Sequence, residues 1–193
     1  MSQARVPPTL APTVVFQAPN GRALLLGNIC AMQSFGPGQS RAGARERTYF
    51  VTCSEQEFVW QDERLSLEEP AAGDVRRSRR AAARFLLLLP DLVRRIDLQL
   101  TRRRRDVLVH CFWGRSRSVA VALGYLMWKK RLTPDEAGDA LDACGHWVQT
   151  PAPPPAAAPV YGDALAIWST LLRVNEYSLT LTALRCVGQL AMP

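Results

Sequence analysis

A cysteine and an arginine, six positions apart, offer the clearest chemistry in the sequence. Cys111 follows the apolar run 107–109, which predicts a buried strand, and Arg117 lies near the start of residues 116–130, whose broad apolar face predicts a helix. In a short loop between a strand and a helix, the N–H groups of the loop and of the first helical turn have no partner inside the helix. Such groups can bind an anion, and the helix dipole adds positive potential.

The same loop suits a reactive cysteine. A field that attracts phosphate also stabilises a thiolate, which is the nucleophilic form of Cys111. Gly114 lets the backbone curl where a side chain would obstruct it. Arg117, one turn into the predicted helix, can fold back and present a planar fork to two phosphate oxygens, which lysine cannot do. These residues together predict a loop that holds a phosphate group against a thiolate.

The segment around this pair reads His110-Cys111-Phe112-Trp113-Gly114-Arg115-Ser116-Arg117-Ser118. It resembles the signature of the cysteine-based protein tyrosine phosphatase superfamily, and most closely that of the dual-specificity protein phosphatase family. Residues 107–109 and 124–127 are similar to the family's strand and following helix, and residues 24–28 resemble its early strand with a Gly-Asn pair.

The resemblance implies an α/β fold, with a central, mostly parallel sheet of four to five strands flanked by helices. It also implies hydrolysis of phosphotyrosine and phosphoserine/threonine in proteins through a cysteinyl-phosphate intermediate, with Cys111 as nucleophile and Arg117 as phosphate clamp. Ser118 would ease departure of the thiolate, and His110 would help to keep Cys111 ionised. The substrate-binding residues would be His110, Phe112, Trp113, Gly114, Arg115, Ser116 and Arg117.

No cofactor and no metal are expected, because the loop amides and Arg117 take the role that Mg²⁺ plays in kinases. A carboxylic acid that protonates the leaving group is expected upstream of the nucleophile. Glu69 follows a predicted strand at residues 65–67, whereas Asp74 lies closer to the family spacing. Both candidates stay open, since either could equally be a solvated loop residue.

We expect a flexible arm over residues 1–12, a catalytic domain over 13–178 and a tail over 179–193. A hairpin is predicted from residues 13–17 and 22–26, which flank the turn sequence Pro19-Asn20-Gly21. Residues 33–46 read as a loop. Apolar periodicity predicts further strands over 49–52, 58–60 and 65–67 and helices over 76–105, with Pro90 at a helix start or kink, and 161–174, while another helix is predicted to begin at Thr133.

The net charge of +7 comes almost entirely from arginine, since Lys129 and Lys130 are the only lysines. This balance favours phosphorylated or polyanionic partners, although a GC-rich genome would produce the same bias. The arginines of residues 76–80 and 102–105 could contact RNA or phosphoinositides, or could simply be solvated helix faces. The alternatives to a protein phosphatase are a phospho-binding pseudophosphatase and a phosphatase acting on RNA 5′-phosphates or phosphoinositides.

The chain has five cysteines, an odd number with no CxxC pair, which fits neither a disulfide framework nor a zinc site. Those other than Cys111 are expected to be small buried residues. No stretch reaches the roughly 20 apolar residues that a membrane-spanning helix needs, so we expect no membrane span. We therefore expect a cytoplasmic protein, with the nucleus as an alternative, and nothing in the sequence indicates its oligomeric state.

Overall fold

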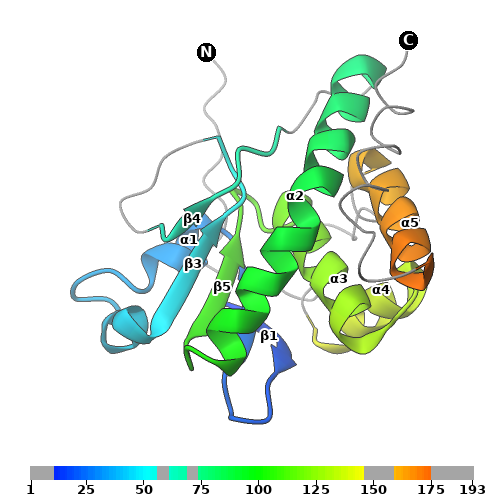
Figure 1. The fold of residues 1–193 in the computed structure, drawn as a ribbon. Coiled ribbons are helices and arrows are strands. Elements are labelled where there is room, and N and C mark those ends of the chain that lie inside the picture. The colour runs from blue at the N-terminus through cyan, green and yellow to red at the C-terminus, as the bar shows by residue number, and fades with distance from the viewer. Residues whose placement is uncertain (1–10, 56–60, 69–73, 146–158, 175–193) are drawn as a thin grey trace, which may run out of the picture.

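A five-stranded sheet forms the centre of the protein in a computed structural model that describes residues 11–55, 61–68, 74–145 and 159–174 (Figure 1). Its strand order is β1-β2-β5-β3-β4, and every pairing is parallel except that of β1 with β2. The expected mostly parallel α/β sheet is therefore confirmed. The strands are β1 (Thr13–Gln17), β2 (Ala23–Gly27), β3 (Thr48–Thr52), β4 (Glu63–Arg64) and β5 (Asp106–His110).

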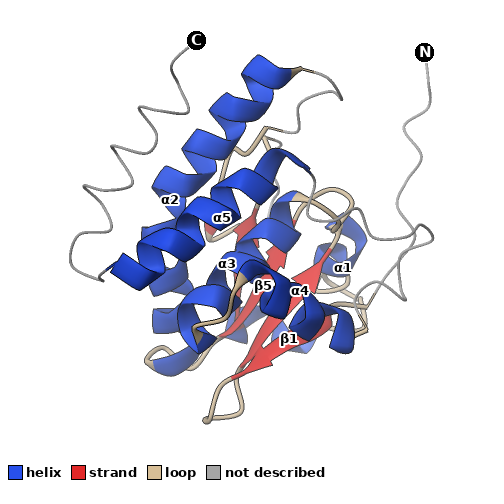
Figure 2. Ribbon diagram, turned by 90° about the vertical axis from the view of Figure 1, so that its right-hand side faces the viewer, coloured by secondary structure: helices blue, strands red, loops and turns tan. Residues whose placement is uncertain are grey.

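Helices cover both faces of this sheet, and most of them lie on one side (Figure 2). That side carries α2 (Val75–Thr101), α3 (Arg117–Lys130), α4 (Pro134–Ala143) and α5 (Pro159–Val174), whereas α1 (Ile29–Gln33) and the 3₁₀ helix η1 (Ala42–Arg47) follow β2. Successive residues of the central strand β5 supply the two cores, because side chains alternate across a strand. Val107 and Val109 join the large core, and Leu108 joins the small core with Phe35 and Phe50.

The hairpin, the strand after η1 and the helix that begins after Thr133 form as predicted. Asn20 and Gly21 lie in the turn between β1 and β2. At Thr133 both halves of a capping box form, since the threonine hydroxyl accepts from the Glu136 N–H while the Glu136 carboxylate accepts from the Thr133 N–H at 2.8 Å. Local sequence chemistry thus determines these elements.

Three predicted elements differ in the structure. Residues 33–46 are not all loop, because they include the end of α1 and most of η1. Residues 65–67 are not a strand, since the Leu67 N–H turns back to the Leu65 carbonyl and the neighbouring strand is β4 instead. Pro90 lies inside α2, which runs through it as one 27-residue helix. The strand predicted at residues 58–60 lies outside the described residues.

The described elements all fall within residues 13–178, whereas the expected arm and tail lie almost entirely outside the described residues. Within the part that is described, no helix combines the length and the apolar character needed to cross a bilayer. The central strand β5 pairs with β2 on one side and with β3 on the other, so that both Gly27 and Thr52 lie opposite His110. The residues that follow these three strands therefore meet at one edge of the sheet.

Candidate active site at the carboxyl end of β5

The loop between β5 and α3 curls tightly because of Gly114. Its φ of +72° lies in the left-handed region, and a Cβ built there would come within 3.0 Å of the Gly27 carbonyl oxygen and 3.2 Å of the Asn28 Cβ. The Ile29 N–H also donates to the Phe112 carbonyl at 3.3 Å. The turn after β2 therefore supports the loop from outside, at a separation that only glycine allows.

The sulfur of Cys111 lies inside this loop and accepts two hydrogen bonds. The backbone N–H of Gly114 and the hydroxyl of Ser118 each donate to Sγ at 3.2 Å. Cys111 is 1% exposed, so these donors act on the sulfur in surroundings from which bulk water is largely excluded. Both donors are therefore directed at the sulfur from inside the loop.

Arg117 is buried at the first position of α3, with 8% of its surface exposed. Burial raises the pKa of the Cys53 thiol, the neighbouring Cys111 raises it further, and the positive charge of Arg117 opposes the rise. Cys53 thus lies within electrostatic reach of both Cys111 and Arg117. The cysteine and the arginine of the predicted pair therefore both lie near Cys53.

His110 connects the site to the neighbouring strand. Its Nε2 lies 2.9 Å from the hydroxyl of Thr52, and burial lowers the pKa of the imidazole to about 4. The ring is therefore neutral near pH 7 and adds no positive charge beside Cys111. Its contact with Thr52 instead joins β5 to β3 immediately before the nucleophilic residue.

The remaining loop residues surround the turn. The rings of Phe112 and Trp113 pack edge to face at 5.3 Å, and both residues are half-buried, as is Arg115. Ser116 is the N-cap of α3, where its carbonyl accepts from the Ala120 N–H at 2.8 Å. Its buried hydroxyl has no hydrogen-bond partner among the residues that the structure describes.

Of the two candidate acids, Asp74 lies within the described residues and Glu69 does not. Asp74 is the N-cap of α2, where its Oδ1 accepts from the Arg77 N–H at 3.0 Å and its Oδ2 lies 3.6 Å from the Arg77 guanidinium. This arrangement gives Asp74 a structural role at the helix start. Glu69 lies outside the described residues, but the segment just before it is anchored, because the Tyr161 hydroxyl donates to the Glu68 carbonyl at 2.6 Å.

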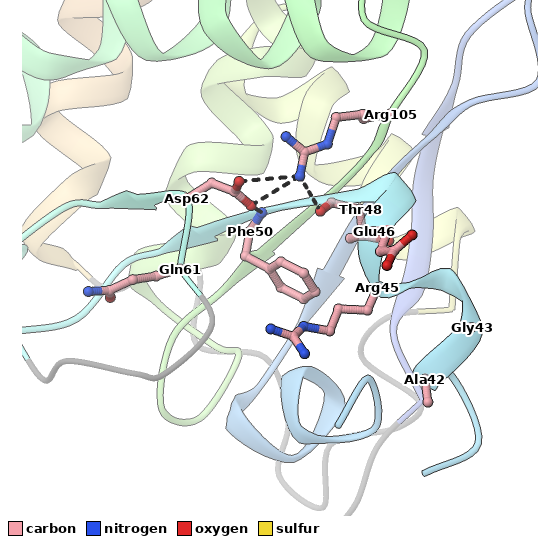
Figure 3. Close-up of a pocket in the computed structure, with 9 residues that line it drawn as sticks. All are labelled: Ala42, Gly43, Arg45, Glu46, Thr48, Phe50, Gln61, Asp62 and Arg105. Carbon is pink, nitrogen blue, oxygen red and sulfur yellow. Dashed lines mark hydrogen bonds and ion pairs between the residues drawn. The ribbon is translucent and has the colours of Figure 1, made fainter. Parts of the chain in front are cut away.

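A separate cavity of about 650 Å³ lies at the opposite edge of the sheet, near the amino ends of β3 and β5 (Figure 3). Two of its charged residues, Arg105 and Asp62, form an ion pair at 3.2 Å. Arg105 donates to the Thr48 carbonyl at 2.8 Å and to the Asp62 carboxylate at 3.2 Å, and Asp62 also accepts from the Phe50 N–H. Arg105 therefore belongs to a structural network and not to an open basic rim.

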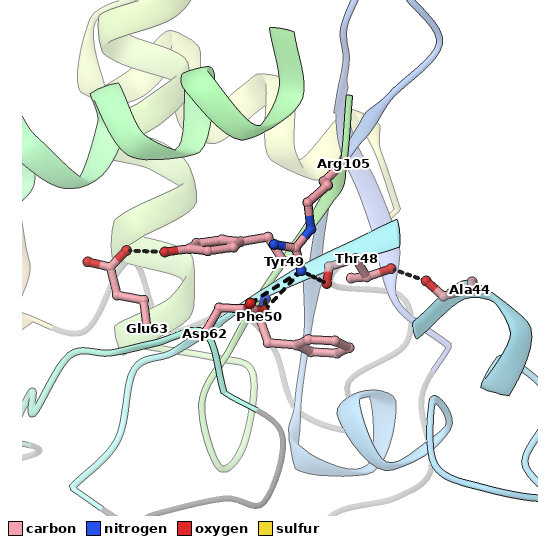
Figure 4. A network of polar contacts seen from close by, with 7 residues as sticks. All are labelled: Ala44, Thr48, Tyr49, Phe50, Asp62, Glu63 and Arg105. Carbon is pink, nitrogen blue, oxygen red and sulfur yellow. Dashed lines mark hydrogen bonds and ion pairs between the residues drawn. The ribbon is translucent and has the colours of Figure 1, made fainter. Parts of the chain in front are cut away.

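The same network fixes the edge strand β4 to β3 (Figure 4). The guanidinium of Arg105 lies 5.3 Å from the ring centroid of Tyr49, whose hydroxyl donates to Glu63 at 3.1 Å. Glu63 in turn forms an ion pair with Arg95 of α2 at 2.7 Å. These contacts hold in place a two-residue strand that pairs with Val51 and Thr52 at the carboxyl end of β3.

Several residues at the site were not predicted from the sequence. Gly27 and Asn28 support the loop, Thr52 contacts His110, and Cys53 lies beside Cys111. Their proximity depends on which strands pair and in which register, and one sequence carries no direct signal for that. The Gly-Asn pair was visible only as a resemblance.

A family model described as the dual specificity phosphatase catalytic domain matches residues 66–149. The fold is similar to that of human DUSP28, at 22% identity with a TM-score of 0.61, covering 88% of this chain and 100% of that one. It is also similar to a mouse putative dual specificity phosphatase complexed with zinc tungstate, at 24% identity with a TM-score of 0.58, covering 90% and 93% of the two chains.

A further similar fold is that of OH1 from Orf virus, a tyrosine phosphatase with triple substrate specificity, at 16% identity with a TM-score of 0.55, covering 86% of this chain and 92% of that one. No curated protein sequence gives a significant match. The family resemblance of the Cys111 segment is therefore confirmed by a family model that includes it and by the shared fold. Residues 66–149 of this chain, which include the Cys111 loop, thus match the catalytic domain of dual specificity phosphatases, and the chain shares its fold with solved phosphatases of this kind.

Proposed function

We propose that this chain hydrolyses phosphotyrosine and phosphoserine/threonine in proteins, with Cys111 as its nucleophile. The observation that carries the proposal is the pair of donors, the Gly114 N–H and the Ser118 hydroxyl, that point at the Cys111 sulfur in the loop before Arg117. A structural cysteine in an ordinary turn needs neither donor. Two donors directed at one sulfur are suited to a cysteine that attacks phosphorus and is released again as a leaving group.

In the first step, the thiolate of Cys111 forms a bond to phosphorus while the bond from phosphorus to the substrate oxygen breaks. Arg117 and the loop amides, including that of Gly114, stabilise the equatorial oxygens as charge develops on them. A carboxylic acid gives its proton to the departing oxygen. The remaining loop residues, Phe112, Trp113, Arg115 and Ser116, shape the surroundings of the phosphate.

In the second step, the oxygen of a water molecule forms a bond to phosphorus while the carboxylate left by the acid takes a proton from that water. The sulfur–phosphorus bond breaks and inorganic phosphate is released. The Ser118 hydroxyl, which already donates to Sγ, stabilises the negative charge that returns to sulfur. His110 holds the end of β5 against β3 as a neutral ring through this cycle. Its role is to position Cys111 and not to supply charge.

Glu69 and Asp74 remain the two candidates for the acid. Asp74 caps α2, so its replacement by asparagine should preserve the cap and remove the proton. The hydrolysis rate of wild type on a phosphotyrosine peptide should fall toward high pH, because the acid loses its proton there. We expect this fall to disappear in Glu69→Gln or in Asp74→Asn, whichever variant removes the acid. If neither variant changes that part of the pH profile, both candidates are wrong.

The function is tested with p-nitrophenyl phosphate, because its good leaving group makes turnover independent of the acid. We expect wild type to hydrolyse it and Cys111→Ser to be inactive, while Arg117→Lys loses most of the rate because an ammonium group cannot bind two oxygens in one plane. Equal rates for wild type and Cys111→Ser would refute the proposal. Tight binding of a phosphopeptide with no turnover would instead indicate a pseudophosphatase.

A further inference from the structure

Exposed arginines occupy the first turns of α2 at helical spacing. Arg76, Arg80 and Arg84 follow one another at intervals of four and so share one face of the helix. Arg77 and Arg79 are exposed beside them. Within the described part of the chain, Arg77 alone of these five forms an ion pair with a carboxylate, that of Asp74.

This arrangement is unfavourable for the helix itself. Positive charges near a helix amino terminus oppose its dipole, and like charges four residues apart repel each other. The N-cap Asp74 offsets part of this through its contact with Arg77, but residues 75–90 contain no further aspartate or glutamate. Where a sequence breaks a local rule with little compensation inside the fold, function is the usual reason.

The arginines lie at the catalytic end of the molecule. Only four residues separate α2 from β5, and the helix runs alongside the strand and continues past its carboxyl end (Figure 1). With parallel axes, a rise of 1.5 Å per helical residue and 3.3 Å per strand residue places Arg84 to Arg76 about 10 to 25 Å beyond the level of His110. Cys111 directly follows His110 in the chain, so the arginines lie beyond the end of the strand that carries the nucleophile.

The second arginine cluster lies at the other end of the sheet. Arg102, Arg103 and Arg104 come just before β5 begins and are exposed, whereas Arg105 is held by Asp62 and Thr48. This cluster is separated from Cys111 by the length of the strand. It has three exposed positive charges, as many as Arg76, Arg80 and Arg84 provide, but it lies far from Cys111.

We propose that Arg76, Arg80 and Arg84 bind an acidic segment of the protein substrate whose phosphorylated residue occupies the Cys111 loop. The inference rests on the proposed function. An extended peptide advances about 3.3 Å per residue, so the acidic residues would lie about three to seven positions from the phosphorylated one. The negative charge of the substrate segment would complement the positive charge of the arginines. Such complementarity raises the rate at which substrate and enzyme associate.

The surface fits a peptide better than RNA or a membrane. Binding of single-stranded nucleic acid adds aromatic side chains on which bases stack, but Phe85, the only aromatic residue of 75–90, is buried. A helix that binds lipid inserts its apolar face, yet the apolar residues Phe85, Leu86 and Leu89 of α2 lie in the protein core. The exposed surface formed by these arginines offers positive charge, but no aromatic ring on which a base could stack and no apolar face that could enter a bilayer. Such a surface is suited to the carboxylates and phosphates of an extended peptide.

The test compares the triple variant Arg76→Gln/Arg80→Gln/Arg84→Gln with the matched variant Arg102→Gln/Arg103→Gln/Arg104→Gln. Glutamine keeps helix propensity, and both variants lose the same charge. Each is assayed at low salt on two phosphotyrosine peptides that differ only in having glutamate or glutamine three to seven positions from the phosphorylated residue. We expect the α2 variant to lose about tenfold in kcat/KM on the glutamate peptide alone.

Hydrolysis of p-nitrophenyl phosphate should be unchanged in both variants, because this substrate cannot reach α2. Equal losses in the two variants, or equal losses on the two peptides, would overturn the proposal. Binding of the fluorescent glutamate peptide to Cys111→Ser, with and without the three α2 substitutions, separates this inference from the proposed function. If turnover is absent but binding still depends on these arginines, only the function fails.

Two further probes address other occupants of the surface. Single-stranded RNA and vesicles containing phosphatidylserine are tested for binding to the same pair of variants. Binding of either probe that needs Arg76, Arg80 and Arg84, together with a glutamate peptide that does not need them, would refute the proposal. Peptide binding that is weakened by these substitutions and by added salt would support it.

Discussion

Replacing Gly114 by alanine tests the shape of the loop. The residue has φ of +72°, and left-handed backbone costs a residue with a Cβ about 1–2 kcal/mol. The new Cβ would also lie 3.0 Å from the Gly27 oxygen and 3.1 Å from its carbonyl carbon, and neither is the end of a flexible side chain. Forcing these backbones apart adds about 1–3 kcal/mol, by analogy with overpacked cores.

Gly38→Ala provides a matched control. Gly38 has φ of +73°, and a Cβ there meets nothing within 4 Å. The control therefore carries the backbone cost alone, about 1–2 kcal/mol. We expect equilibrium unfolding in urea to show that Gly114→Ala loses about 1–3 kcal/mol more than Gly38→Ala.

The two variants should differ more in activity than in stability. Movement of the loop takes the Gly114 N–H away from the Cys111 sulfur, where the two atoms now lie 3.2 Å apart. Loss of one well-placed donor costs about 10²–10³ in kcat in enzymes that stabilise an anion. Gly38→Ala should keep wild-type kcat on p-nitrophenyl phosphate. Equal stability and equal kcat for the two variants would refute this account of the loop.

Three further predictions concern stability. Burial lowers the pKa of His110 from 6.5 to about 4, so the unfolded chain takes up a proton at higher pH than the folded one. The free energy of unfolding should therefore fall by about 3 kcal/mol as pH drops from 6.5 to 4. A His110→Gln variant that keeps the same pH dependence would contradict this. Thr133→Ala should cost about 1 kcal/mol and Thr133→Ser much less in thermal unfolding, since only serine preserves the capping box with Glu136; equal losses would remove the cap as the cause. Gly124→Ala should cost about 1–3 kcal/mol, because its Cβ would lie 2.7 Å from Leu89 Cδ1, and a double-mutant cycle with Leu89→Ala should show coupling of the two sites.

The predicted part of the site is contiguous in the chain. The strand before Cys111, the loop with Gly114 and the helix that begins at Arg117 are neighbours in sequence, so spacing alone relates their positions. The periodicity of the apolar residues and the type of each loop residue were sufficient to predict this unit. The structure shows the same unit, with the two hydrogen bonds to sulfur as the added detail.

The unpredicted part depends on strand pairing. Thr52 contacts His110 because β3 lies parallel to β5 in a register that places these two residues opposite each other, and Gly27 lies opposite His110 through β2. A single sequence does not specify which strands become neighbours. At residues 65–67 the sequence predicts a strand that does not form. Leu65 and Leu67 are buried apolar residues whose alternation suggests a strand, but the backbone turns there.

Rapid quenching in acid after mixing wild type with a phosphotyrosine peptide tests the central claim most directly, because a phosphoryl group on sulfur can then be located by mass spectrometry of the digested protein. We predict one phosphoryl group on the peptide that contains Cys111, formed before phosphate is released and absent from Cys111→Ser. A phosphoryl group on another residue, or turnover by wild type with none on Cys111, would contradict the claim that this sulfur attacks phosphorus.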